Sequence, residues 1–128
     1  MSGFRLEGLI VSGYGHAADP LARLSELYRQ KTGVSLFPGT LNVELDQDWP
    51  TPAGFARIEP GEGGCRVGVT LIRCRIEGLE AFILRTDGNS APGGLHSLRI
   101  VEVAAEVRLR TALGLSDGER VRLDLETR

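Results

Sequence analysis

Short apolar segments separated by turn-forming residues run through most of this chain, and only one segment has a clear helical period. The strand pattern is clearest in TLNVEL, residues 40–45, where Leu41, Val43 and Leu45 alternate with polar residues. Alternation with a period of two predicts a strand with one buried face. No strand–helix–strand rhythm is present, and closely spaced strands with intervening turns favour a small barrel.

Six or seven short strands are expected, and no linker separates them. They cover residues 4–11, 40–45, 55–58, 66–76, 81–84, 98–105 and 121–125. The apolar phase of the 66–76 segment slips by one between Leu71 and Ile72, which predicts a bulge or a bend. Glu77-Gly78 predicts a hairpin turn after that segment. Residues 87–94 (DGNSAPGG) have the composition of an exposed loop.

One longer helix and one short helix are expected among these strands. The apolar face of the longer helix is carried by residues at three- and four-residue spacing, Leu21, Leu24, Leu27 and Tyr28. Asp19 followed by Pro20 fits an N-cap and a first helical position, and Gly33 is a plausible end. The short helix is expected over residues 107–115. The fold class is therefore mainly β, a barrel with one or two helices.

Length and charge limit the classes of function. The 128 residues fit one domain, residues 1–128, and the net charge is -2. Duplex nucleic acid is an unexpected partner, because no bulk basic charge is present to bind its phosphates. A membrane span is not expected, because no apolar run approaches 18 residues.

The N-terminal residues and the cysteines favour a cytoplasmic protein. Residues 1–7 are charged where a signal peptide requires an apolar run. Cys65 and Cys74 are nine positions apart, a spacing that matches no compact zinc site. We expect two small buried residues in a reducing compartment.

Few motifs of established chemistry occur. His16 and His96 are the only histidines, and no GxSxG, HExxH or Walker A lysine is present. Gly13-Tyr14-Gly15 follows the first strand. Such a loop either presents backbone N–H groups to a phosphate or simply forms a tight turn.

Polar residues at three strand ends are candidates for a site. Thr40 and Asn42 carry neutral oxygens on one strand face, where they either complete a magnesium shell or face solvent. Arg108 and Arg110 lie where a strand meets the short helix, as an anion site or as solvated side chains. Glu102 interrupts an apolar strand, so its carboxylate points outward or lines a cavity, where it can act as a base.

Three segments resemble the CTP-dependent riboflavin kinases, a mostly archaeal family. Residues 37–43 (FPGTLNV) resemble its PGTLNV signature, and residues 102–110 (EVAAEVRLR) resemble its LEIIAPxxLR segment. Residues 113–121 (LGLSDGERV) are similar to its LxLxDGDxV ending. The likeness covers nearly the whole chain, and the Gly13-Tyr14-Gly15 loop lies where the family has a glycine-rich nucleotide loop.

The resemblance implies a six-stranded cradle-loop barrel that transfers a phosphoryl group from CTP to riboflavin, giving FMN and CDP. It implies that Thr40 and Asn42 hold Mg²⁺, and that Glu102 contacts the flavin and is the base. Gly94 and His96 align with a further flavin contact. The implied nucleotide-binding residues are Gly13, Tyr14, Gly15, His16, Val107, Arg108, Leu109 and Arg110. No additional helix-turn-helix domain is expected, and the protein is expected to be a monomer or a small homo-oligomer.

Two alternatives follow from departures from the family pattern. His16-Ala17-Ala18 stand where the family has a second glycine and a basic residue, and Glu106 replaces a proline. Loss of a basic side chain near the phosphate removes charge stabilisation, so one alternative is a barrel that binds nucleotide or flavin without turnover. The other is a DNA-binding barrel of the swapped-hairpin type, which the acidic charge balance disfavours.

Overall fold

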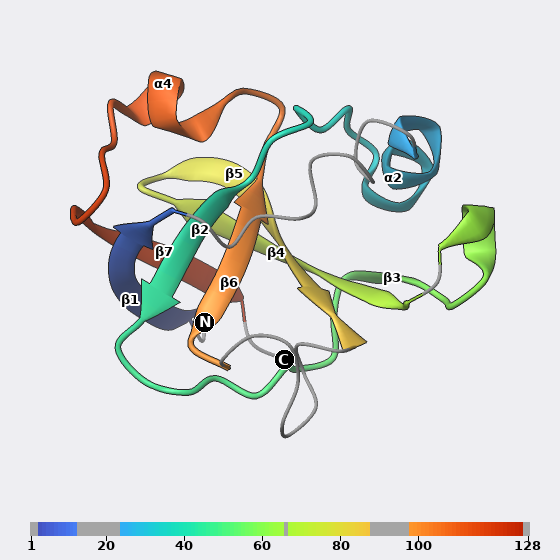
Figure 1. Cartoon of the computed structure of the whole chain (residues 1–128), viewed down its shortest axis with the longest axis horizontal. Helices are drawn as coiled ribbons and strands as arrows, with labels where there is room; N and C mark the ends of the chain where they lie inside the picture. The colour runs from blue at the N-terminus through green and yellow to red at the C-terminus, as the bar shows by residue number, and fades with distance from the viewer. Residues whose placement is uncertain (1–2, 13–23, 66, 88–97, 127–128) are drawn as a thin grey trace.

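Six antiparallel strands close into a barrel, and a seventh extends it. The computed structural model describes residues 3–12, 24–65, 67–87 and 98–126. Within these ranges the strand order is β3-β4-β5-β6-β2-β1-β7, and pairing of β4 with β7 closes the barrel and leaves β3 outside it (Figure 1). The strands are β1 (Gly3–Val11), β2 (Leu41–Leu45), β3 (Ala56–Ile58), β4 (Val69–Ile76), β5 (Leu79–Thr86), β6 (Ile100–Ala104) and β7 (Arg120–Glu126). The expected six-stranded barrel is confirmed.

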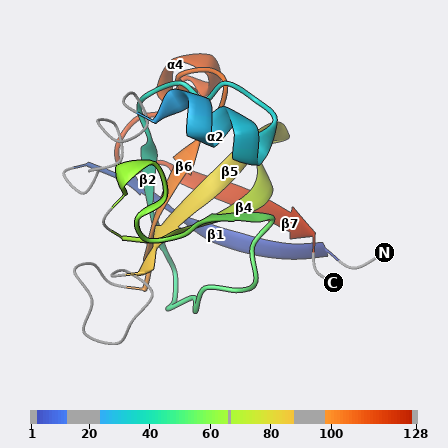
Figure 2. The ribbon, with the colours of Figure 1, turned by 90° about the vertical axis from the view of Figure 1, so that its right-hand side faces the viewer.

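The helices are short and lie at one end of the barrel. Helix α2 spans Ser25–Thr32 and α4 spans Leu109–Leu113, and both lie at the same end in two perpendicular views (Figure 1, Figure 2). Helix α2 ends at Gly33, as predicted, in the left-handed conformation. Its expected start at Asp19-Pro20 lies outside the described residues. A 3-10 turn spans Glu62–Gly64. In the described ranges, neither helix has the length and apolar character that crossing a membrane requires.

The barrel interior is apolar. Side chains alternate across each strand, so one face of every barrel strand points inward. The interior is filled mainly by aliphatic residues, among them Ile10, Val43, Ile76, Ile83, Val101, Val103, Val121 and Leu123. Cys74 belongs to this cluster, and burial raises the pKa of its thiol to about 12. Cys65 is only partly buried, which corrects the expectation of two buried cysteines.

A second apolar cluster covers part of the outside of the barrel. Tyr28 of α2 and Ile58 of β3 pack there against β4 and β5 through Val69, Leu71, Phe82 and Leu84. The cluster explains the phase slip in β4. Leu71 faces this outer cluster, whereas Ile72 faces the interior. The β4–β5 register runs unbroken from Val69–Thr86 to Ile76–Leu79, so the alternative of a bulge is wrong.

Two glycines mark places where the backbone needs freedom. Glu77 (φ 48°) and Gly78 (φ 87°) form the predicted two-residue turn between β4 and β5. Gly8 pairs with both Leu45 and Val121, and a Cβ at Gly8 would lie 2.3 Å from the carbonyl oxygen of Glu44. The close approach of β1 to β2 therefore requires glycine there.

Arg85 at the end of β5 is fully buried, although no acidic partner contacts it within the described ranges. Its Nη1 donates to the carbonyl oxygen of Trp49, at 2.5 Å, and its Nη2 donates to those of Leu98 and Ile100, at 2.9 and 3.3 Å. Burial lowers the pKa of Arg85 to about 10, so the side chain stays charged at neutral pH. Arg85 thus joins the segment after β2 to the start of β6.

Replacement of Arg85 by Met is expected to lower the free energy of unfolding by about 3 kcal/mol, because three carbonyl groups, two of them buried, lose a charged donor. Urea unfolding measures the loss, with Arg75→Met as the control. Arg75 is exposed on β4, and its replacement should change stability by less than about 0.5 kcal/mol. Equal losses for the two variants would show that Arg85 does not join these segments.

Candidate functional site

A row of side chains crosses four strands on the outer face of the barrel. Glu102 of β6 pairs with Leu84 of β5 on one side and with Asn42 of β2 on the other, and Asn42 pairs with Val11 of β1. The residues on either side of Asn42 and Glu102 in their strands are buried in the interior. Asn42 and Glu102 therefore face outward, next to each other. The start of β2 and the end of β6 point toward the end of the barrel that carries the helices (Figure 1).

The side chains of Thr40, Asn42 and Glu102 form the polar centre of this row. The hydroxyl of Thr40 donates a hydrogen bond to Oε1 of Glu102, at 3.0 Å. Asn42 is only 7% exposed, and its Oδ1 has no hydrogen-bond partner among the described residues. A buried carbonyl oxygen without a partner is costly, so it indicates a place for a ligand. The structure thus brings Glu102 next to Thr40 and Asn42, a pair that the sequence suggested separately from it.

The turn before β2 places Thr40 over Glu102. The backbone N–H of Phe37 donates to the carbonyl oxygen of Ala105, at 2.7 Å, which ties the turn to the end of β6. The N–H of Gly39 donates back to the carbonyl oxygen of Phe37, at 2.8 Å, and closes the turn. The FPG segment therefore brings Thr40, at the start of β2, within hydrogen-bond distance of Glu102 on β6.

Tyr28 is a neighbour of the site that sequence reasoning missed. It is 2% exposed, and it packs in the outer cluster with Leu84 and Ala104, next to Glu102 along β5 and β6. Burial raises the pKa of Tyr28 to about 12, and the charges of Cys65 and Glu102 add to the effect. Its phenol therefore stays protonated near the carboxylate. The helical pattern showed only that Tyr28 lies on an apolar face.

Arg110 contacts the end of β1. Its Nη2 donates to Oγ of Ser12, at 3.0 Å, and forms an ion pair with Asp117. Ser12 directly precedes Gly13 in the sequence, so Arg110 contacts the last described residue before the glycine-rich segment. The sequence identified Arg110 but missed Ser12 and Asp117, because the Asp117-Gly118 pair reads as an ordinary turn.

The three residues that precede Arg110 in the sequence differ in their exposure and in their contacts. Val107 is 43% exposed, and the Nη1 of Arg108 donates to the hydroxyl of Thr111, at 2.8 Å. Leu109 is 3% exposed and packs in the barrel interior, so a nucleotide contact at Leu109 would use its backbone. The other predicted site residues lie outside the described residues: Gly13, Tyr14, Gly15, His16, Gly94 and His96.

The oxygen atoms at Thr40 and Asn42 fit a divalent cation that is shared with a phosphate. Magnesium in phosphoryl-transfer sites keeps waters and substrate oxygens and takes few protein ligands. No cluster of three His, Cys, Asp or Glu residues with metal-binding geometry occurs in the part of the chain that the structure describes. A site dependent on protein carboxylates and imidazoles is therefore not seen there, whereas the unpartnered Oδ1 of Asn42 suits a shared ion.

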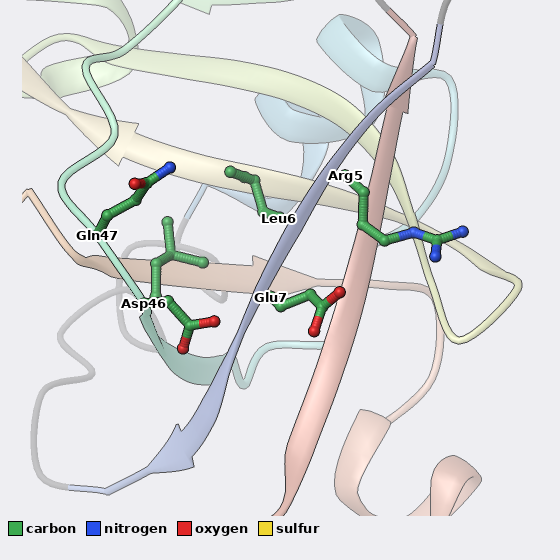
Figure 3. A pocket seen from close by; sticks show the side chains of 6 residues that line it. Arg5, Leu6, Glu7, Asp46 and Gln47 are labelled. Atoms are coloured by element: carbon green, nitrogen blue, oxygen red, sulfur yellow. The ribbon is translucent and has the colours of Figure 1, made fainter.

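A hollow lies beside β1 at the C-terminal end of β2, away from Thr40 and Asn42. Figure 3 shows it between the start of β1 and the segment after β2, lined by Arg5, Leu6, Glu7, Leu45, Asp46 and Gln47. None of the predicted site residues lines this hollow. The geometry of Thr40, Asn42 and Glu102, and not the hollow, identifies the candidate site.

A family model matches most of the chain. The model of CTP-dependent riboflavin kinases, described as "Domain of unknown function DUF120", matches residues 10–125. The matched range contains Thr40, Asn42, Glu102 and Arg110.

Several similar proteins are named riboflavin kinase. The protein from Pyrobaculum arsenaticum is 30% identical over 98% of this chain and 62% of its own length. The protein from Methanocella arvoryzae is 33% identical over 94% of this chain and 56% of its own length. The protein from Methanothermobacter thermautotrophicus is 33% identical over 91% of this chain and 94% of its own length. The chain thus spans less than two thirds of the first two relatives and nearly all of the third.

Because Oδ1 of Asn42 has no hydrogen-bond partner among the described residues, we expect the side chain to contribute little to thermal stability. Replacement of Asn42 by Leu should leave the melting temperature unchanged or raise it, because a buried carbonyl group without a partner is removed. Replacement of the adjacent interior residue Leu41 by Ala should cost about 3 kcal/mol, since it leaves a cavity. Thermal unfolding compares the two variants. A loss for Asn42→Leu as large as that for Leu41→Ala would show that the Asn42 side chain is part of the packed fold.

Proposed function

The chain belongs to the CTP-dependent riboflavin kinase family, and we propose that it transfers a phosphoryl group from CTP to riboflavin, releasing CDP and FMN. The observation that carries the proposal is the grouping of Thr40, Asn42 and Glu102, two neutral oxygens and a carboxylate, on the outer face of β2 and β6. Support also comes from the family match over residues 10–125 and from a relative of similar length that is named riboflavin kinase.

The reaction exchanges one phosphorus–oxygen bond for another. The terminal hydroxyl of the riboflavin side chain attacks the γ-phosphorus of CTP, and the bond between that phosphorus and the β,γ-bridging oxygen breaks. CDP leaves with this oxygen, and the hydroxyl proton passes to a base. Phosphoryl transfer of this kind depends mainly on positioning and on neutralising charge.

Glu102 is the proposed base. Its carboxylate is half-buried, and Oε1 accepts the hydrogen bond from the hydroxyl of Thr40. This bond fixes one oxygen and leaves Oε2 to accept the proton of the attacking hydroxyl. The pairing of Glu102 with Asn42 across β6 and β2 fixes the separation between the proposed base and the proposed magnesium site.

Thr40 and Asn42 are the proposed holders of Mg²⁺. When bound, Mg²⁺ neutralises negative charge on the phosphate oxygens. Asn42 is held in place by its position in the middle of the sheet, with strands on both sides. The turn at Phe37 and Gly39 holds Thr40 at the start of β2. The two side chains are thus positioned by backbone hydrogen bonds, from strand pairing at Asn42 and from the turn at Thr40, and substrate binding requires little rearrangement of them.

The remaining contacts are proposed from the sequence signature. Arg110 and the backbone of residues 107–109 hold the nucleotide, together with residues 13–16 of the glycine-rich segment. Gly94 and His96 contact the flavin. Arg110 lies beside Ser12 at the end of β1, which supports a nucleotide site between α4 and the glycine-rich segment.

A turnover assay tests the proposal directly. Purified protein is mixed with riboflavin and Mg²⁺, CTP or ATP is added in parallel, and the flavins are separated by chromatography. FMN is expected with CTP and not with ATP. FMN with ATP alone would mean that the departures in the loop changed the donor, and binding of CTP and riboflavin without FMN would favour an inactive binding barrel.

Substitution of the proposed base tests the mechanism. Glu102→Gln should lower kcat by about 10²–10³-fold and leave the affinity for CTP within about twofold, because only proton transfer is lost. Steady-state kinetics with CTP and riboflavin measures both constants. Glu44→Gln is the control, because Glu44 is exposed on the same face of β2. An unchanged kcat for Glu102→Gln would exclude Glu102 as the base.

A further inference from the structure

Three side chains from separate segments converge at the end of β1. The hydroxyl of Ser12 lies 2.8 and 2.7 Å from the two carboxylate oxygens of Asp117 and donates to them. The Nη2 of Arg110 donates to Oγ of Ser12, at 3.0 Å, and pairs with the same carboxylate. We call these residues, Ser12, Arg110 and Asp117, the β1–α4 clamp. Each member contacts both others, unlike a simple ion pair.

Main-chain hydrogen bonds and one buried side chain fix the segments that carry the β1–α4 clamp. The N–H of Gly118 donates to the carbonyl oxygen of Ile10, at 2.8 Å, and the N–H of Ile10 donates to that of Glu119, at 2.9 Å. The turn that carries Asp117 is therefore tied to the last residues of β1. Leu109, next to Arg110, is anchored in the barrel interior. The three side chains thus meet with little freedom in the main chain.

The charge state of the clamp is stable at neutral pH. The hydrogen bond from Ser12 and then that from Arg110 hold the pKa of Asp117 below its usual range. The carboxylate of Asp117 is therefore ionised throughout the neutral range and remains paired with Nη2 of Arg110. Within the described residues, Nε and Nη1 of Arg110 make no hydrogen bond, so part of the guanidinium remains available to another anion.

We propose that Asp117, together with Ser12, is a positioning residue that fixes Arg110 and the end of β1 for binding of the CTP phosphates. The inference rests on the proposed function. A guanidinium already held by one nitrogen loses less conformational entropy when it binds a phosphate, so positioning adds to affinity. The same contacts fix Ser12, which directly precedes the glycine-rich segment at Gly13.

A second ion pair between β1 and β7 offers a matched control. Arg5 and Asp124 lie 2.9 Å apart, both about half exposed, near the opposite end of the barrel from the helices. The pair is similar in kind to the one between Arg110 and Asp117, but no hydroxyl joins it and it lies away from the candidate site. Exposed pairs contribute little to stability, so neither Asp→Asn change should unfold the protein.

The test compares Asp117→Asn with Asp124→Asn in the full chain. Calorimetry measures the Kd for CTP with Mg²⁺, quenching of flavin fluorescence measures the Kd for riboflavin, and thermal unfolding measures stability. We expect Asp117→Asn to weaken CTP binding about tenfold, with riboflavin binding and melting temperature unchanged. Ser12→Ala should give a smaller loss, and Asp117→Glu should restore part of it. Asp124→Asn should change none of the three.

Other outcomes overturn the inference. Unchanged CTP affinity in Asp117→Asn, with a wild-type protein that binds CTP, removes the positioning role and leaves the proposed function intact. Parallel losses of CTP affinity, riboflavin affinity and melting temperature would show that the clamp only stabilises the fold. A wild-type protein that binds neither CTP nor riboflavin overturns both the inference and the proposed function.

Discussion

Closure of the six-stranded barrel decides which side chains of this protein are available for chemistry. Because β4 pairs with β7, every barrel strand has a neighbour on both sides, and its inward face is filled by apolar residues. Polar groups in the middle of these strands must then lie on the outer face. Asn42 and Glu102 are paired there, and the turn that leads into β2 is hydrogen-bonded to Ala105, just after β6. The candidate site is thus built on the outside of the barrel.

Much of the fold could be predicted from the period-two alternation, and some of it could not. The strands, the Glu77-Gly78 turn and the end of α2 at Gly33 follow from local patterns. The cause of the phase slip at Leu71 and Ile72 could not be predicted. The outer cluster that Leu71 joins is formed by segments that are distant in the sequence. The burial of Arg85 was not predicted, since nothing local shows the carbonyl groups that surround it.

The candidate site, too, could be predicted only in part, because local sequence patterns do not show contacts between distant segments. Thr40, Asn42 and Glu102 were found because a short signature carries two of them and an apolar strand carries the third. The burial of Asn42 was not predicted, because alternation shows which face a residue occupies but not whether another segment covers that face. Asp117 and Ser12 were missed because each is ordinary in its own segment, and only the closure of β1 against β7 brings them to Arg110.

We propose that Asn42, with Thr40, meets a cation carried by the nucleotide, on the outer face of β2 beside Glu102. Manganese is a paramagnetic substitute for magnesium, and it broadens the NMR signals of nearby nuclei. With Mn²⁺ and CDP added to ¹⁵N-labelled protein, the side-chain amide signal of Asn42 should disappear first. The signal of Gln47, beyond the far end of β2, should persist. Equal broadening of both signals, or loss of Gln47 alone, would contradict the account.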